Sequence, residues 1–301
     1  DVVKNTTNRR YTAMSKINIR LAKKLDMEFN ANGYVNTRMY NAGSVNPTDY
    51  AYNTSRTIPA FNEDGSYSYY KKYLGGMVGY LDYNILNELE NSYSKQNVQS
   101  VMATLNMRYR PLDCLNFNWT TSVNSSSSNQ ETWYGEKSFY IANLRRCNYG
   151  EVPDGNSLCP YGGELQSGNT RVSGWTTRLQ SNFNQYFGAD KNHMFNFALG
   201  VELSSSRTKG YSRTDRMYFA DRGETFMKGI TPSEFPSYYN DFVANNIPKL
   251  TDGLNNIFSM YGTLTYAYKT YFTLNANARS DGSNKFGNRS NEKILPIWSV
   301  S

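Results

Sequence analysis

Carboxylates and a single histidine are the residues that could perform acid–base chemistry in this chain. Glu88/Glu90 and Asp215/Asp221 are carboxylate pairs that could suggest hydrolysis. Glycoside hydrolysis requires two carboxylates at a defined separation on either side of the scissile bond, and a polar loop sequence does not set that separation. His193 begins a segment beside a turn, where we expect it to face solvent. We therefore predict that the chain is not an enzyme, and a secreted β-rich glycosidase is not favoured.

Three cysteines are the other residues with chemical potential. Cys147 and Cys159 fall in one predicted loop with eleven residues between them, and in an oxidising compartment they could close that loop by a disulfide. Cys114 is alone at a predicted tight turn. No spacing of Cys and His resembles a zinc site. The sequence therefore predicts no metal and no cofactor.

Aromatic residues in the predicted loops offer binding chemistry instead. Trp133 and Tyr134 lie in one such loop, and Tyr238 and Tyr239 follow Phe235-Pro236 in another. Flat rings give sugars an apolar platform, and nearby Asn and Asp side chains can hydrogen-bond their hydroxyl groups. These four residues are candidate ligand contacts; the alternative for each is loop packing or an aromatic girdle at a membrane interface.

The elements that must position these residues alternate in polarity with a period of two, which predicts β-strands. From Leu25 to Val35 every second residue is uncharged, and the residues between are mostly Asp, Glu and Asn. The same pattern recurs in eight predicted strands, at 11–21, 25–38, 97–110, 115–128, 171–187, 193–207, 256–268 and 271–279.

Very tight turns and much longer polar loops join these strands in alternation. The tight turns lie at Ala22-Lys23-Lys24, Pro111–Cys114, Gly188–Asn192 and near Lys269-Thr270. The long loops are predicted at Met39–Gln96, Ser128–Thr170 and Thr208–Asn255. Outer-membrane barrels have short turns on the periplasmic side and long loops outside. The sequence therefore predicts an all-β fold, an arc of a large antiparallel transmembrane β-barrel with short periplasmic turns and long extracellular loops.

Composition is compatible with this fold. Hydrophobic residues make up 39% of the chain and mean hydropathy is −0.68, as expected when a strand needs apolar side chains only at alternate positions. Aromatic residues, at 15%, could supply interface girdles. The net charge of +7 comes from Lys and Arg scattered along the chain, without a long basic run. Nucleic-acid binding is therefore not favoured.

The segment Ala278–Gly287 carries a family resemblance. It contains Arg279, Asp281, Gly282, Ser283, Phe286 and Gly287, and it resembles the Arg-x-Asp-Gly-Ser-Ser-Arg-Phe-Gly stretch of SusC/RagA-type TonB-dependent outer-membrane transporters of Bacteroidota. Asn284-Lys285 stands where Ser-Arg is commoner. We expect Asp281-Gly282 to form a tight bend and Phe286 to anchor at the barrel rim, with Gly287 allowing close backbone approach.

Three further segments are similar to that family. Leu295–Ser301 resembles its Pro-x-x-Ser-x-Ser strand, Arg56–Tyr67 its Arg-Thr-x-Pro…Asp-Gly-x-Tyr loop, and Tyr83–Leu89 its Asn-Pro-x-x-x-Leu segment, with Ile85 in place of Pro. The resemblance covers the barrel only. We therefore expect residues 1–301 to be a partial barrel domain of a longer chain, without the plug domain and the final strands.

The resemblance implies import across the outer membrane of oligosaccharides, or of peptides. A SusD-like surface lipoprotein would help to capture the substrate, and TonB would drive its release by pulling on the plug domain. The alternative is a non-transporting secreted or surface β-rich protein that binds glycans. Solubility without detergent and a native fold of the isolated chain would indicate that alternative.

Overall fold

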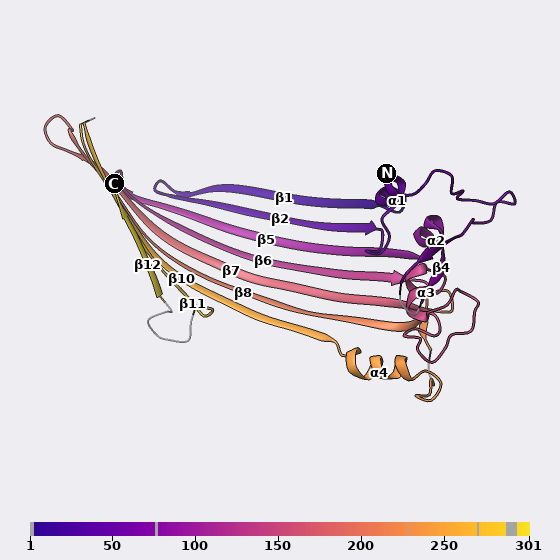
Figure 1. Cartoon of the computed structure of the whole chain (residues 1–301). Helices are drawn as coiled ribbons and strands as arrows, with labels where there is room; N and C mark the ends of the chain where they lie inside the picture. The colour runs from indigo at the N-terminus through magenta and orange to yellow at the C-terminus, as the bar shows by residue number, and fades with distance from the viewer. Residues whose placement is uncertain (1–2, 76–77, 228, 270, 287–293) are drawn as a thin grey trace.

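The computed structural model describes residues 3–75, 78–227, 229–269, 271–286 and 294–301. Its main element is one curved antiparallel sheet in which the long strands follow each other in chain order (Figure 1). The order runs β1-β2-β5-β6-β7-β8-β10-β11-β12, and the short β9 pairs with β8. The predicted all-β arc is confirmed.

The strands of this sheet have the following bounds: β1 Thr7–Ala22, β2 Leu25–Tyr40, β5 Ser92–Leu112, β6 Leu115–Tyr134, β7 Gly163–Phe187, β8 His193–Phe219, β9 Thr225–Phe226, β10 Lys249–Tyr268, β11 Phe272–Ser283 and β12 Ile294–Val300. A separate hairpin consists of β3, Tyr70–Tyr73, and β4, Tyr80–Tyr83. The helices are α1 Pro47–Asn53, α2 Ile85–Glu90, α3 Phe139–Arg145 and α4 Pro236–Asn245. Among the described residues, no helix is long and apolar enough to cross a membrane.

The alternation of tight turns and long loops is also confirmed. Two residues separate β1 from β2 and β5 from β6, and five separate β7 from β8. The strands extend further at the other end than predicted: β7 begins at Gly163 instead of 171, and β8 ends at Phe219 instead of 207. These extensions contain charged residues and Gly as well as Ser, Thr, Asn and Gln, so the apolar alternation fades while the backbone ladder continues.

The register places the alternating residues of all strands on two continuous faces. Directly paired residues across seven strands form an apolar row that comprises Ile19, Met27, Met107, Trp119, Leu179, Val201 and Met260. The neighbouring row on the opposite face comprises Asn18, Glu28, Asn106, Thr120, Arg178, Glu202, Ser259 and Asp281. The division into an uncharged face and a polar face, predicted from the sequence, therefore holds in these rows, whereas nearer the long-loop end the first of these faces also carries Arg171, Arg207 and Lys209.

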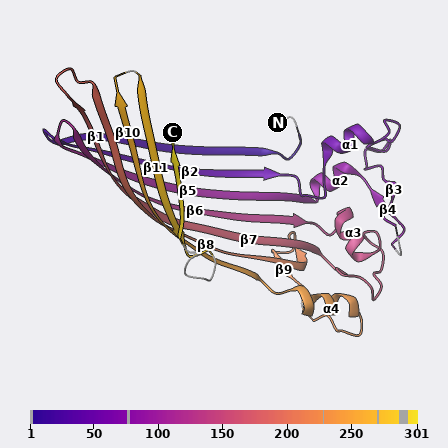
Figure 2. The same ribbon diagram turned by 60° about the vertical axis from the view of Figure 1, so that its left-hand side comes forward.

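The connections at the long-loop end form a packed layer that we call the loop cap, which comprises the described residues of 41–91, 135–162 and 220–248, that is, without 76–77 and 228. Figure 2 shows its helices gathered at one end of the strands, with the tight turns at the other end. The sequence predicted these segments only as loops. Two buried clusters hold the loop cap on the strand ends: one contains Ile141 and Tyr134 of β6, and the other contains Phe235 and Met217 of β8. A third cluster, which contains Leu89, lies within the loop cap itself.

The bend expected at Asp281-Gly282 is wrong. Both residues belong to β11, where Gly282 pairs with Phe258 of β10 and Ile294 of β12. Gly282 does not have a positive φ, because the ladder continues through it. Phe286 lies beyond the strand end and is half-buried, and Gly287 lies outside the described residues.

Candidate functional site

A polar pocket lies where the polar face of β6, β7 and β8 meets the loop cap. Its volume is about 650 Å³. Alternate residues of the three strands form its floor, and α3 and α4 contribute its walls. The lining includes Gln130, Thr132, Tyr140, Glu164, Gln166, Ser212, Thr214, Arg216, Tyr238, Asp241, Phe242, Asn245 and Lys249.

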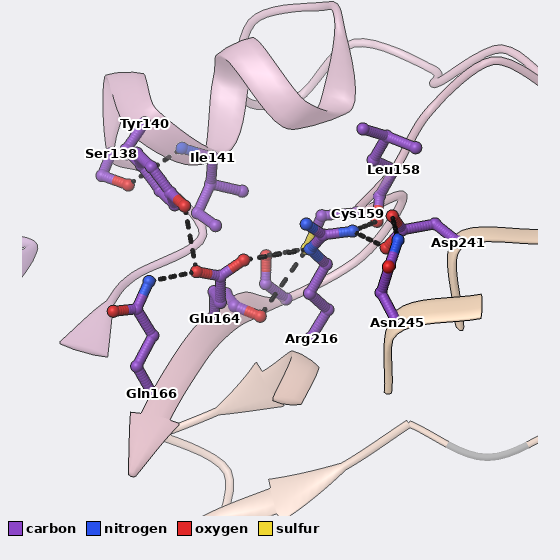
Figure 3. Close-up of polar contacts among 12 residues, drawn as sticks. Ser138, Tyr140, Ile141, Leu158, Cys159, Glu164, Gln166, Arg216, Asp241 and Asn245 are labelled. Carbon is purple, nitrogen blue, oxygen red and sulfur yellow. Dashed lines mark hydrogen bonds and ion pairs between the residues drawn. The ribbon is translucent and has the colours of Figure 1, made fainter. Parts of the chain in front are cut away.

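Glu164 and Arg216 both line this pocket and are joined in a network of polar contacts (Figure 3). The two residues are a directly paired couple of β7 and β8. The Arg216 Nε donates to Glu164 Oε2 over 3.0 Å, and its Nη1 donates to the Asp241 carboxylate on α4. Glu164 is almost fully buried. A buried carboxylate requires such partners, because burial without them is costly.

Neutral donors complete the coordination of Glu164. The Tyr140 hydroxyl donates to Glu164 Oε1 over 3.0 Å, and Gln166 Nε2 donates to the same oxygen over 2.7 Å. On the other side, Asn245 Nδ2 donates to Asp241 Oδ1 over 2.9 Å. Burial and the adjacent Glu164 carboxylate raise the pKa of the Tyr140 hydroxyl, so Tyr140 remains a donor near neutral pH.

Local sequence explains why the two strand ends meet in this way. Gly163 precedes Glu164, and a Cβ there would lie 2.1 Å from the carbonyl oxygen of Tyr134. Only glycine therefore lets β7 begin directly beside the end of β6. Opposite it, Met217 is an extra residue with φ of 62°, between the pairs Gly163–Tyr218 and Glu164–Arg216. This β-bulge accompanies the packing of the Met217 side chain with Phe235 and Tyr238.

The two helices of the pocket are fixed by local signals. Ser138 caps α3, since its Oγ accepts from the backbone N–H of Ile141. Pro236 occupies the first position of α4, where a missing N–H has no cost. The Tyr140 ring stacks on that of Tyr134 with centroids 3.9 Å apart. These contacts place Tyr140 and Asp241 on opposite sides of the Glu164–Arg216 pair.

Of the four predicted aromatic contacts, only Tyr238 lines the pocket. Trp133 and Tyr134 do not lie in a loop but are the last residues of β6. Tyr134 is buried under Tyr140, and Trp133 packs against Tyr93 with centroids 5.4 Å apart. Tyr239 belongs to α4 but is not part of the lining.

The predicted disulfide is not formed in the structure, where all three cysteines are free thiols. Cys159 is buried, and its Sγ lies 3.6 Å from the carbonyl oxygen of Gly163. Cys147 Sγ instead lies 3.8 Å from the carbonyl oxygen of Glu151. The two thiols therefore have separate partners. Within the described part of the chain, no cluster of three His, Cys, Asp or Glu could hold a metal ion.

The structure also separates the carboxylates considered for acid–base chemistry. Glu88 is buried in α2, whereas Glu90 is exposed. Asp215 pairs with Arg213, and Asp221 lies in an exposed turn. His193 is half-buried rather than solvent-facing, because its ring lies against Tyr266 and Tyr268 and its Nδ1 is 2.8 Å from the Tyr266 hydroxyl.

The family motif contributes to the polar face rather than to the pocket. Arg279 Nε donates to both carboxylate oxygens of Asp281, over 2.8 and 2.9 Å, and its Nη2 donates to the buried Ser259. Ser283 is the last residue of β11, with its Oγ 3.5 Å from Asn255 Oδ1. Two of the three other quoted segments meet at Asn84 of Tyr83–Leu89. Its Nδ2 donates to the carbonyl oxygen of Ala60, within Arg56–Tyr67, and to that of Ser68, directly after it.

Sequence reasoning missed Glu164, Arg216 and Asp241. Period-two alternation extended to Glu164 and Gln166 would have found the first of them, since both are on the polar face of β7. The pairing of Glu164 with Arg216 depends on the bulge at Met217. No pattern in the amino-acid sequence predicts that register.

No protein-family model matches the chain, and no curated protein matches it. Solved structures do. The RagAB peptide importer in its open-open state superposes with a TM-score of 0.70 at 15% identity, over 99% of this chain and 30% of that one. The RagAB peptide transporter gives 0.67 at 13% identity, over 98% and 30%.

A second kind of importer also has this fold. The ferric-catecholate import receptor Fiu of Escherichia coli K12, in its closed form, gives a TM-score of 0.50 at 13% identity, over 98% of this chain and 39% of that one. The chain thus spans about a third of the length of these proteins. At such identities the likeness establishes the fold alone, and the chain folds as an arc of the antiparallel β-barrel of these importers.

Proposed function

We propose that this chain is part of a TonB-dependent outer-membrane transporter of the SusC/RagA type that imports oligosaccharides or peptides. The observation that carries the proposal is the pocket of about 650 Å³ on the polar face at the long-loop end. In a closed barrel this face borders the lumen and this end faces outward. A ligand arriving from outside would meet the pocket before it reached the lumen.

The chemistry of the pocket suits a neutral ligand rich in hydroxyl or amide groups. Arg216 is matched by Glu164 and Asp241, and Arg213 is matched by Asp215. The remaining lining is largely Ser, Thr, Asn and Gln, with Tyr140, Tyr238 and Phe242 as aromatic surfaces. Side-chain amides and hydroxyls can both donate and accept hydrogen bonds, and the rings provide apolar contact.

The proposed partners follow from the family resemblance. A SusD-like lipoprotein would cover the loop cap from outside, and TonB would act on a plug domain elsewhere in the full protein. The apolar face that includes Met107, Trp119 and Leu179 would contact outer-membrane lipid. The proposed location is therefore the outer membrane of a member of Bacteroidota, and the proposed process requires no bond-making step.

The proposal is tested by uptake of fluorescent oligosaccharides and fluorescent peptides into cells that carry the full-length protein. Ser212→Trp fills the pocket from the polar face of β8, so uptake of the imported class should fall at least tenfold. Ser181→Trp, on the apolar face of β7, is the matched control and should retain uptake. Absence of uptake of both classes by the unaltered protein contradicts import. Surface binding of a glycan without uptake would instead favour the non-transporting glycan-binding protein.

A further inference from the structure

A second buried carboxyl group lies in the loop cap, outside the pocket. Glu88 is 2% exposed and belongs to α2, in the connection between β2 and β5. Unlike Glu164, it has no ion pair with the part of the chain that the structure describes. The nearby positive charge is Lys72 of β3, whose amine lies over the rings of Tyr83 and Phe139 at 4.3 and 5.2 Å.

Glu88 joins two loops that are distant in sequence. Its Oε1 accepts from the backbone N–H of Phe139, the first residue of α3, over 2.7 Å, and from Asn87 Nδ2 over 3.2 Å. Asn87 Nδ2 also donates to the carbonyl oxygen of Lys137 over 2.9 Å. One carboxyl group and its neighbour therefore hold the start of α3 against α2.

The surroundings favour the protonated form of this group. Burial raises the pKa of Glu88 to about 7, and the hydrogen bonds and Lys72 offset this only in part. The other titratable groups facing it are tyrosines. Burial raises the pKa values of Tyr83 and Tyr69 above their ordinary range, so both hydroxyls stay neutral near pH 7. Glu88 is thus the group of this contact that changes charge there.

We propose that Glu88 is a proton-controlled joint between α2 and α3, which packs more firmly when the carboxyl group binds a proton. When the two helices separate, water reaches Glu88 and its pKa returns to the ordinary value of 4.5. Since the packed state has the higher pKa, packing is strongest below about pH 4.5 and weakens as the pH rises to about 7. Above that value both states are ionised and no further change is expected.

The joint is connected to the pocket by adjacent residues. The backbone N–H of Phe139 donates to Glu88, and the hydroxyl of the next residue, Tyr140, donates to Glu164 in the pocket. Opening of the joint would therefore loosen one donor of the Glu164–Arg216 pair. An effect on substrate binding rests on the proposed function, whereas the joint itself does not.

Hydrogen exchange on the purified full-length protein tests the joint without any substrate. Peptides covering 85–92 and 138–145 are followed between about pH 4.5 and 8, and each rate is divided by the intrinsic rate at that pH. The ratio gives the equilibrium constant for local opening of the α2–α3 contact. This opening constant should rise with pH, by up to about tenfold per pH unit, and level off above about pH 7. Glu88→Gln should abolish this rise. Glu90→Gln, at an exposed position of the same helix, should preserve it.

If Glu88→Gln fails to fold, infrared difference spectroscopy of the unaltered protein still tests whether Glu88 binds a proton. The band of a protonated carboxyl group should disappear from the unaltered protein near pH 7 and be missing from Glu88→Gln or Glu88→Ala. An opening constant independent of pH, an equal pH dependence in Glu88→Gln, or a Glu88 carboxyl that titrates at its ordinary pKa overturns the joint. Because none of these readouts involves transport, their failure leaves the import proposal untouched, and a failure of import leaves the joint untouched.

Discussion

The sheet and the loop cap are stabilised in different ways. Along the sheet the backbone ladder is continuous, but large apolar side chains such as Met14, Val101 and Leu199 remain half or more exposed. In the loop cap, Ile141 is fully buried and three hydrophobic clusters form a core of ordinary globular kind. The sheet therefore leaves large apolar side chains uncovered, whereas the loop cap buries its own.

This difference indicates which region of the molecule depends on particular residues. Paired positions of the sheet repeat a simple apolar or polar choice over many strands, so many sequences satisfy it. The loop cap depends on individual contacts, such as the close approach of Gly163 to Tyr134 and the four hydrogen bonds of Asn84. The residues of the candidate pocket lie where these two regions join. Substitutions in the two regions should therefore have separable effects.

The largest effect is expected for Arg216→Ala, at the junction. It leaves Glu164 buried without its cationic partner, and removal of one partner of a buried pair costs about 3–5 kcal/mol. Backbone amide hydrogen exchange in residues 236–245 and 138–145 should therefore be faster than in the unaltered protein. Arg207→Ala is the matched control on the same strand: its bidentate pair with Asp252 is exposed to solvent, so its removal should change stability far less than Arg216→Ala does. Equal losses of stability in the two variants would show that the junction depends on its ion pair no more than the sheet does.

The next effect separates the core of the loop cap from the sheet. Ile141→Ala creates a cavity at a fully buried position and should cost about 2–5 kcal/mol of local stability. Limited proteolysis should then cut within 135–162, while the barrel keeps the gel mobility of a folded outer-membrane protein. Ile17→Ala, at an exposed position of β1, should leave protease resistance unchanged. Cleavage at the same rate in both variants would contradict a separately packed loop cap.

A pair of neighbouring residues tests which face of the sheet meets lipid. Leu179 lies on the apolar face of β7 and Gln180 on the polar face. An arginine at the middle of the lipid face of a barrel costs about 2–4 kcal/mol, so Leu179→Arg should lower the stability of the full-length protein against urea in lipid vesicles by about that amount. Gln180→Arg should be nearly neutral. The reverse ranking would exchange the two faces.

The same division explains how much could be predicted from the sequence. Period-two alternation predicted all of the long sheet strands up to β11, together with their two faces, because pairing and pleat follow directly from it. It could not predict α3 or α4, because these short helices depend on single local signals such as Ser138 and Pro236. Nor could it predict the pocket, since Glu164, Arg216 and Asp241 come from three segments that only the Met217 bulge and the packing of α4 bring together. Trp133 and Tyr134 were misplaced because the polar end of β6 resembles a loop.

The smallest effect is expected for Cys147→Ser, which tests the loop cap without disturbing its core. The Cys147 thiol is half-exposed and has no bond to Cys159, so the substitution should change the free energy of unfolding by no more than about 0.5 kcal/mol. If a disulfide joined the two residues in the mature protein, the loss would instead be about 2–5 kcal/mol. Burial raises the pKa of the Cys159 thiol to about 11, so in the folded protein a maleimide should modify Cys147 readily and Cys159 very slowly. Peptide mapping without reductant should recover both thiols unlinked, and a Cys147–Cys159 peptide pair would show that oxidation, rather than packing alone, holds 147–159 in place.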